Sequence, residues 1–403
     1  MALTAAKDLE PSVSFQRLIL NQGELISNKL NMLRFEHYPP NAVRALRSFS
    51  LGEVAYFLGV TQSNIKKLHL DQKGPVPATS PTGRRTYTAT QIMELRQYLD
   101  KHGRTDVKKY VPQRRNGEPL QVIAVVNFKG GSGKTTTAAH LVQHLALTGH
   151  RVLAIDLDPQ ASLSALHGIQ PELDKTYSLY DAIRYDGAKK PISAIIRGTS
   201  FPGLDIVPAS LELQEYEYDT PLAAADKTRT DGKLFFTRIS ETLREVDAAY
   251  DVVVIDCPPQ LGYLTLTALT AASSVIITIH PQMLDIMSMS QFLLMLGGIL
   301  ESISSVGAEV RLKWFRYLVT RFEPTDGPQS QMVGFMQALF PAQMLKSHML
   351  KSTAISDAGI TNQTLYEVER AQFTRETYDR ALDALNAVNE EIARLIHVAW
   401  GRN

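Results

Sequence analysis

The residues with the clearest chemistry form a glycine-rich segment between an apolar run and a helical pattern. The apolar run is Val122–Val126, and the segment Lys129–Thr136 that follows contains Gly130, Gly131 and Gly133. Because glycine has no Cβ, backbone N–H groups at such positions can close around phosphate oxygens. A helix that begins directly after the loop adds aligned donors and the positive end of its dipole. The order strand, glycine-rich loop, helix therefore predicts a nucleotide phosphate site.

Side chains in this segment have the chemistry to hold a nucleotide and its metal ion. Lys134 can reach β- and γ-phosphates, and the hydroxyl of Thr135 can ligate Mg²⁺. We therefore expect ATP and Mg²⁺ as cofactors. The residues expected to contact the nucleotide are Gly130, Gly131, Ser132, Gly133, Lys134, Thr135 and Thr136.

Carboxylates follow two further Val/Ile-rich runs. Asp156 and Asp158 come after Val152–Ile155, and Asp256 comes after Val252–Ile255. In an open α/β sheet the carboxyl ends of strands face the ligand crevice. Asp256 is expected to hold Mg²⁺, partly through water, with Asp156 as a further metal candidate. Asp158 is expected to orient or deprotonate an attacking water. The plainer interpretation of either carboxylate alone is a helix N-cap.

A second candidate site lies near the N-terminus and has the pattern of a DNA-binding helix-turn-helix. Two short helical patterns are joined at Gly59, and Ser50 and Thr61 are suited to cap them. The second helix would present its N-terminal polar residues to base edges. The residues expected to contact DNA there are Gln62, Ser63, Asn64, Lys66 and Lys67.

The next segment resembles the wing of a MerR-like winged helix. Gly83–Tyr87 precedes a helical pattern over Ala89–Leu99, and Arg84 and Arg85 suit contacts to phosphates or the minor groove. Residues 1–120 carry 18 Lys and Arg against 10 Asp and Glu, whereas the remainder carries 24 against 31. This basic front end favours nucleic-acid contact over the alternative, a plain helix pair joined by glycine.

From residue 121 onward, short Val/Ile-rich runs alternate with longer helical patterns. Such runs are typical of strands covered on both faces, and their alternation with helices predicts right-handed βαβ units. The runs are Val122–Val126, Val152–Ile155, Leu204–Val207, Val252–Ile255, Val275–Ile279 and Tyr317–Thr320. We therefore predict an α/β P-loop NTPase fold with a mainly parallel sheet flanked by helices.

Four segments are expected along the chain. An apolar stripe over Ser14–Leu33 predicts a helix that cannot bury this stripe alone, so we expect it to dimerise. A last helix over about Arg375–Trp400 is expected to dock on the body. The predicted domains are a dimerisation helix in 1–40, a winged helix-turn-helix in 41–102, a linker in 103–120 and an ATPase domain in 121–403.

Composition narrows the class of protein. The 403 residues are 44% hydrophobic and 21% charged, which predicts several domains with sizeable cores. A single cysteine, Cys257, excludes an internal disulfide and a cysteine-rich metal cage, so we expect a reducing, cytoplasmic location. No secretory signal is recognised. The longest uninterrupted apolar run, near Phe292–Leu300, has about nine residues against the ~20 of a membrane span, so no membrane partner is expected.

Several of these motifs together resemble one family. Lys129–Thr136 is similar to the deviant Walker A box of the ParA/MinD ATPases. Leu157–Ser162 and Asp256–Pro259 resemble the next two signatures of that family, and Ile206–Ser210 resembles a further one. The resemblance covers about Gln121–His397. Together with the N-terminal region, the chain most resembles the larger ParA subclass and the RepA partition proteins of repABC-type plasmids.

The resemblance implies that Lys129 reaches across a dimer interface to the other subunit's nucleotide, so that ATP holds two subunits together. It also implies non-specific DNA binding by late basic residues, for which Lys346 and Lys351 are candidates. Arg321 and Pro324 occupy the position of the adenine loop. The implied partners are DNA, a ParB-type centromere-binding protein and a second copy. The implied setting is the nucleoid, with slow, partner-stimulated hydrolysis and repression of the protein's own operon.

Four other functions are weighed against this one. MinD-like membrane positioning needs a basic amphipathic tail, and Ala393–Asn403 has no lysine. An iron-protein reductase needs more thiolates than Cys257. An amide-forming P-loop ligase leaves residues 1–120 without a role. A sequence-specific regulator that only senses nucleotide remains open.

Overall fold

The computed structural model describes residues 14–37, 45–80, 83–102, 110–169, 176–226, 234–305 and 310–402. The chain divides into two compact units, Met1–Arg44 and Ala45–Asn403. The first contains helix α1 (Phe15–His37), which confirms the expected N-terminal helix. Its apolar side chains are exposed, with Phe15 at 77% and Leu25 at 63%. Dimerisation through this face stays a prediction.

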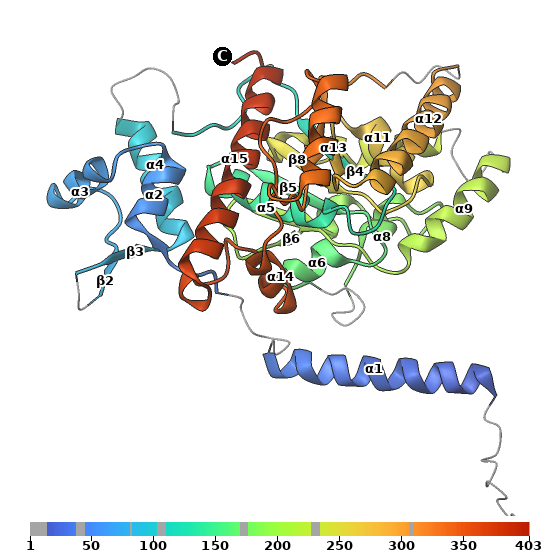
Figure 1. Ribbon diagram of the computed structural model, residues 1–403, viewed down its shortest axis with the longest axis horizontal. Helices are drawn as coiled ribbons and strands as arrows, with labels where there is room; N and C mark the ends of the chain where they lie inside the picture. The colour runs from blue at the N-terminus through green and yellow to red at the C-terminus, as the bar shows by residue number, and fades with distance from the viewer. Residues whose placement is uncertain are drawn as a thin grey trace, which may run out of the picture. The chain divides into compact units, whose positions relative to one another are not determined.

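The second unit is organised around a seven-stranded sheet in the order β10-β9-β4-β8-β5-β7-β6. Figure 1 shows strands β4, β5 and β8 of this sheet among the surrounding helices. The strands are β4 (Gln121–Val126), β5 (Val152–Asp156), β6 (Arg197–Gly198), β7 (Leu204–Val207), β8 (Val252–Asp256), β9 (Ser274–Ile279) and β10 (Trp314–Val319). Every pair is parallel except β6 with β7. The mainly parallel α/β fold and its six expected strands are confirmed. The two-residue antiparallel edge strand β6 was not expected.

Both faces of this sheet are buried, as the near-continuous Val/Ile runs require. Along β4, Ile123 and Val125 belong to one hydrophobic core, whereas Val122, Ala124 and Val126 belong to the other. Helices α5 (Lys134–Leu147), α6 (Ser162–Leu166), α14 (Thr353–Ile360) and α15 (Arg375–Ala399) contribute to the first core. Helices α8 (Leu179–Ile183), α9 (Leu213–Ala225), α10 (Arg238–Arg244), α11 (Tyr263–Ala271), α12 (Met283–Ser305) and α13 (Gly327–Leu339) contribute to the second. Short 3-10 turns are η1 (Ile192–Ala194), η2 (Phe235–Thr237), η3 (Asp247–Ala249) and η4 (Arg370–Gln372).

Residues 45–102, hereafter the N-terminal module, combine three helices with a small antiparallel sheet. The helices are α2 (Leu51–Leu58), α3 (Gln62–Leu70) and α4 (Ala89–His102), and the strands are β1 (Phe49–Ser50), β2 (Ala78–Thr79) and β3 (Arg85–Tyr87). Ser50 forms a capping box with Glu53 at the start of α2, and Thr61 accepts a hydrogen bond from the backbone of Asn64. Gly59 ends α2 with φ 63°, a left-handed conformation that favours glycine. The expected helix pair, its caps and its turn are therefore confirmed.

The described half of the expected linker, residues 110–119, is fixed against the body. The backbone N–H of Arg114 donates to Asp251 Oδ1 at 3.1 Å. The indole N–H of Trp400 donates to the carbonyl of Pro119 at 2.9 Å, and Arg402 donates to the carbonyl of Pro112 at 2.8 Å. The end of α15 thus holds the entry to β4, while residues 103–109 lie outside the described residues.

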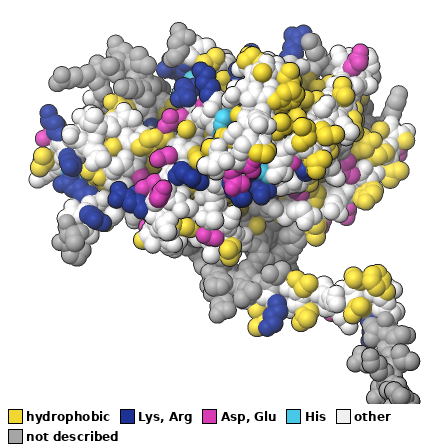
Figure 2. Space-filling model, viewed as in Figure 1, with side chains coloured by type: hydrophobic (Ala, Val, Ile, Leu, Met, Phe, Trp, Pro, Cys, Tyr) yellow, Lys and Arg dark blue, Asp and Glu magenta, His cyan; other side chains and the backbone are white. Residues whose placement is uncertain are grey.

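Helix α12 is long and largely apolar. By length and composition it is apolar enough to cross a membrane, with mean hydropathy 1.6 over a window that is 28% buried. It was not singled out from the sequence, because polar residues such as Asp285 and Gln291 divide its apolar residues into shorter runs. Met289 and Phe292 are buried in the core, whereas Leu284 and Leu294 are 70% and 76% exposed. Figure 2 shows hydrophobic side chains gathered over this part of the body.

Candidate functional site

The glycine-rich loop joins the end of β4 to the start of α5. Gly131 and Gly133 have φ values of 76° and 83°, which disfavour any residue with a Cβ. A Cβ at Gly133 would also lie 3.3 Å from the Cβ of Thr320 at the end of β10. Glycine is therefore required at these two positions by conformation and at Gly133 also by close packing.

One anchor of the loop comes from a residue that the sequence reasoning did not single out. Asn127 Nδ2 donates to the carbonyl of Thr278 at 2.5 Å, and its Oδ1 accepts from the backbone N–H of Lys129 at 2.9 Å. The Ser132 and Thr278 hydroxyl oxygens are 3.0 Å apart. The only signal for Asn127 in the sequence is a polar residue directly after an apolar strand.

The segment that directly follows β10 supplies a second anchor. Thr320 Oγ1 donates to the carbonyl of Ser132 at 2.7 Å, and Arg321 Nη1 donates to the carbonyl of Gly131 at 3.2 Å. This places Arg321, expected in the adenine loop, directly on the phosphate loop. Pro324 follows on the exposed surface three residues later.

Lys134 begins α5 and is only 6% exposed. Its Nζ donates to the carbonyl of Lys129 at 3.2 Å. Burial lowers the pKa of Lys134, and the charges of Asp256 and Asp158 act in the opposite direction. The structure thus brings together the lysine and both carboxylates that were predicted from separate segments.

Asp256 is the last residue of β8, and its carboxylate is buried. Neither of its oxygens makes a hydrogen bond of normal geometry with the described residues, although the side chain is fully buried. Burial and the charge of Asp156 raise its pKa well above its usual range, while nearby Thr135 and Lys134 act to lower it. Buried polar atoms are rarely left unpaired, so this carboxylate is suited to binding a cation.

Asp156 lies beside Asp256 in register on β5, but its environment differs. Its Oδ2 accepts hydrogen bonds from the backbone and hydroxyl of Ser164 at 2.8 and 2.7 Å, and its Oδ1 accepts one from the backbone of Asp158 at 3.2 Å. Burial raises its pKa to about 7 despite these bonds. Both oxygens are therefore engaged by protein groups, which disfavours the expected role as a direct metal ligand.

Asp158 is half-buried, and its Oδ1 accepts a hydrogen bond from the backbone of Gln160 at 3.0 Å. It lines a pocket of about 480 Å³ together with Glu217, Pro258 and Gly262. Among the described residues, no three His, Cys, Asp or Glu side chains form a metal-binding group. A cation here would therefore need ligands from a nucleotide and from water as well.

Lys129 does not point into the loop of its own chain. Its Nζ forms an ion pair with Asp285 Oδ2 at 2.8 Å in the first turn of α12. The lysine side chain is 40% exposed and that of Asp285 is 6% exposed. This pair was not predicted from the sequence, because its members are 156 positions apart.

The predicted DNA-contacting residues of α3 share one exposed surface. Gln62, Ser63, Asn64, Lys66 and Lys67 are all exposed. Arg84 is exposed as well, whereas Arg85 is half-buried and donates to His69 Nδ1 at 3.1 Å. Figure 2 shows basic side chains gathered on this part of the molecule.

The two late lysine candidates are also at the surface. Lys351 Nζ forms an exposed ion pair with Glu323 at 2.9 Å, and its backbone pairs with Phe322 beside the Arg321 segment. Lys346 is exposed, and its backbone N–H donates to Glu391 on α15.

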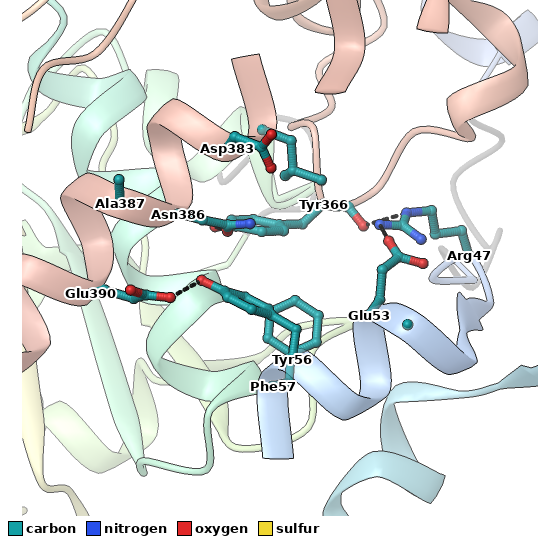
Figure 3. Close-up of a pocket in the computed structure, with 11 residues that line it drawn as sticks. Arg47, Glu53, Tyr56, Phe57, Tyr366, Asp383, Asn386, Ala387 and Glu390 are labelled. Atoms are coloured by element: carbon teal, nitrogen blue, oxygen red, sulfur yellow. Dashed lines mark hydrogen bonds and ion pairs between the residues drawn. The ribbon is translucent and has the colours of Figure 1, made fainter. Parts of the chain in front are cut away.

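The N-terminal module is attached to the body through a contact that the sequence did not predict (Figure 3). Tyr56 donates to Glu390 on α15 at 2.5 Å, and Arg47 donates to the carbonyl of Tyr366 at 3.0 Å. The ring of Phe57 lies 6.2 Å from that of His144 on α5. These residues border a pocket of about 400 Å³ between module and body.

Arg96 of α4 completes this attachment. It is 5% exposed and donates to the carbonyls of Phe57 at 2.5 Å, Leu147 at 3.1 Å and Tyr110 at 2.7 Å. Burial lowers its pKa to about 10. Because Leu147 is the last residue of α5, this one helix begins at the phosphate loop and ends on the N-terminal module.

Comparison with known proteins agrees with this geometry. A family model described as an AAA domain matches residues 120–306, which include the phosphate loop and Asp256. The chain is 71% identical to a Sinorhizobium fredii protein named as a replication protein A, over 96% of this chain and 95% of that one. It is 31% identical to the chromosome partitioning protein ParA of Myxococcus xanthus, over 59% of this chain and 77% of that one. A solved structure described as a partition protein shares the fold, with TM-score 0.59, 17% identity and coverage of 93% of this chain and 98% of the other.

Proposed function

The chain belongs to the ParA-type partition ATPases, and from this premise we propose that it is an ATP-switched protein that partitions DNA. Relatives named for chromosome partitioning support the partition role. In this proposal, ATP binding closes two subunits, and the closed dimer holds DNA without sequence preference. Hydrolysis, stimulated by a ParB-type partner, opens the dimer and releases the DNA.

The observation that carries the proposal is the unpaired, buried carboxylate of Asp256 beside Lys134. A carboxylate in that position fits Mg²⁺ held jointly by Asp256, the Thr135 hydroxyl, water and a nucleotide. The ion, when bound, neutralises charge on the β- and γ-phosphates. Lys134 would move from the carbonyl of Lys129 to the phosphates.

In this proposal the other residues of the site have the roles that the sequence predicts. The backbone N–H groups of the loop from Gly130 to Thr136 would surround the phosphates, and Arg321 would border the base or ribose with Pro324. Asp158, half-buried at the edge of the loop, would orient the attacking water. Lys129 would contact the nucleotide of the second subunit. Since this contact exists only in the closed dimer, hydrolysis by isolated chains should be slow.

DNA would be bound in two modes. The α3 surface and the wing would read an operator in the manner of a winged helix, with Arg84 and Arg85 on phosphates. This mode would repress the protein's own operon. Lys346 and Lys351 would contribute to non-specific phosphate binding by the closed dimer, which should weaken as salt rises.

Sedimentation of the full chain tests the proposal. The chain is measured with ATP, with ADP and without nucleotide, each with and without non-specific DNA. We expect self-association and DNA co-sedimentation with ATP only. Equal behaviour with ATP and ADP would contradict the nucleotide switch.

A second candidate is a regulator that only senses nucleotide. The direct attachment of α5 to the module through Arg96 favours it, because a nucleotide-induced shift of α5 would reach α3 without a partner protein. Single-turnover hydrolysis with DNA and a ParB-type protein separates the two. Stimulation supports the partition ATPase, and an unchanged rate supports the regulator.

A further inference from the structure

Helix α12 is connected to the nucleotide loop at two points on one of its faces. The ring of Phe128, directly before the loop, stacks on Phe292 with centroids 5.5 Å apart and an interplanar angle of 16°. The next residue, Lys129, pairs with Asp285. Asp285 and Phe292 are seven positions apart, so they lie on the same face two turns from each other. The start of the loop therefore has a fixed partner outside the phosphate site.

The ion pair is unequal in burial. Asp285 is 7% exposed, and Lys129 is its only ion-pair partner among the residues that the structure describes. Leaving a buried charge without its partner is strongly unfavourable, whereas the half-exposed lysine can return to water. The pair is thus maintained mainly because breaking it would leave the buried carboxylate of Asp285 without a partner.

The backbone of Lys129 has little freedom to move. Its N–H is bonded to Asn127 Oδ1, and its carbonyl accepts from Lys134 Nζ. Only the side chain can change partner. One ammonium group cannot at the same time lie on Asp285 and on a phosphate in another subunit.

We propose that Asp285 is a positioning residue that keeps Lys129 within its own subunit until nucleotide-bound subunits close. This inference rests on the proposed function, in which Lys129 contacts the second subunit's nucleotide. The Lys129–Asp285 pair must then break when two subunits close. Asp285 therefore raises the protein concentration at which ATP brings two chains together. In nucleotide-free chains the ATPase domains are kept from closing on each other because their Lys129 is already occupied.

The first test measures how available the lysine is in nucleotide-free chains. Full-length protein is treated briefly with an acylating reagent, and modification of Lys129 and Lys351 is followed by mass spectrometry. Lys351 serves as the internal control because its partner Glu323 is exposed rather than buried. In the wild-type chain, Lys129 should react more slowly than Lys351. Equal or faster reaction at Lys129 would refute the proposal without any variant.

Asp285→Asn should speed acylation severalfold at Lys129 and leave Lys351 unchanged. Asp285→Glu keeps the charge and should restore slow reaction. A general loosening of the structure would raise the acylation rates of both lysines together, and that result would count against a positioning role.

The second test measures ATP-dependent association of the same variants by sedimentation. Asp285→Asn should associate at a protein concentration about tenfold lower than the wild type, with no change in ADP. The matched control, Glu323→Gln, removes an exposed pair near the loop and should behave as the wild type. If the wild-type chain does not associate with ATP, the proposed function fails. If it does, and Asp285→Asn associates equally or more weakly, only the role of Asp285 fails.

Discussion

The buried polar groups at the two ends of α5 differ in whether protein groups pair with them. Beside its first turn, neither oxygen of Asp256 makes a hydrogen bond of normal geometry with the described residues, and Lys134 lies on a backbone carbonyl. At its last residue, the guanidinium of Arg96 donates to three carbonyls from three segments. The first region lacks a group that a ligand would supply, whereas the second is complete within the chain. Burial of charge is common to both, so the missing partner distinguishes a binding site from a structural contact.

The largest difference should appear with Lys134→Ala. A charge-assisted hydrogen bond contributes up to about 3 kcal/mol, so nucleotide affinity should fall about 100-fold. The unfolding free energy of the chain should change little, because the removed ammonium is bonded to only one carbonyl. Titration with a fluorescent ATP analogue measures the affinity, and Lys351→Ala is the exposed control. A loss of stability as large as the loss of binding would break the comparison.

The same contrast explains what could be predicted from the sequence. Phosphate chemistry requires glycine at positive φ, a lysine and a carboxylate at strand ends, so Gly131, Gly133, Lys134 and Asp256 were predictable. The strands were predictable because both faces of the sheet are buried. Asp156 was predicted as a further metal ligand, and its engagement by Ser164, which disfavours that role, required the fold.

The attachment at the far end of α5 could not be predicted. The acceptors of Arg96 are backbone carbonyls, which any residue provides, so no residue type at Phe57, Leu147 or Tyr110 reports the contact. The Lys129–Asp285 pair likewise joins distant segments. Such contacts depend on how elements pack, and a single sequence carries no pattern for them.

A change at the module contact should affect stability and leave nucleotide binding intact. Arg96→Met removes the donor from three carbonyls near the end of α5, and a buried acceptor without a partner costs about 1–3 kcal/mol. We expect the unfolding free energy to fall by about 2 to 3 kcal/mol in urea titrations. Arg375→Met, at a side chain that is 85% exposed, is the matched control and should change stability little. ATP affinity should stay within a factor of two of the wild type. A larger loss of affinity in Arg96→Met would show that the two ends of α5 are coupled.

Acidification should change the contributions of the two regions to the unfolding free energy in opposite directions. Burial lowers the pKa of His144, on α5 against the module, to about 4, whereas burial raises the pKa of Asp156, beside the nucleotide loop, to about 7. Between pH 6.5 and 4 the unfolded chain binds a proton at His144 that the folded chain does not, so this residue's contribution is present above pH 6.5 and is lost as pH falls. Asp156 acts oppositely, because from about pH 7 down to about 4 the folded chain holds the extra proton.

Unfolding free energies of the wild type, His144→Asn and Asp156→Asn at pH 7 and pH 5 measure both contributions. His144→Asn should lose about 2 kcal/mol less than the wild type on acidification, since it lacks the protonating imidazole. Asp156→Asn should lose more than the wild type, because it lacks the carboxyl group that takes up a proton in the folded state. If both variants shift in the same direction, the two regions do not differ in how they tolerate buried charge. The contrast between the nucleotide site and the module contact would then fail.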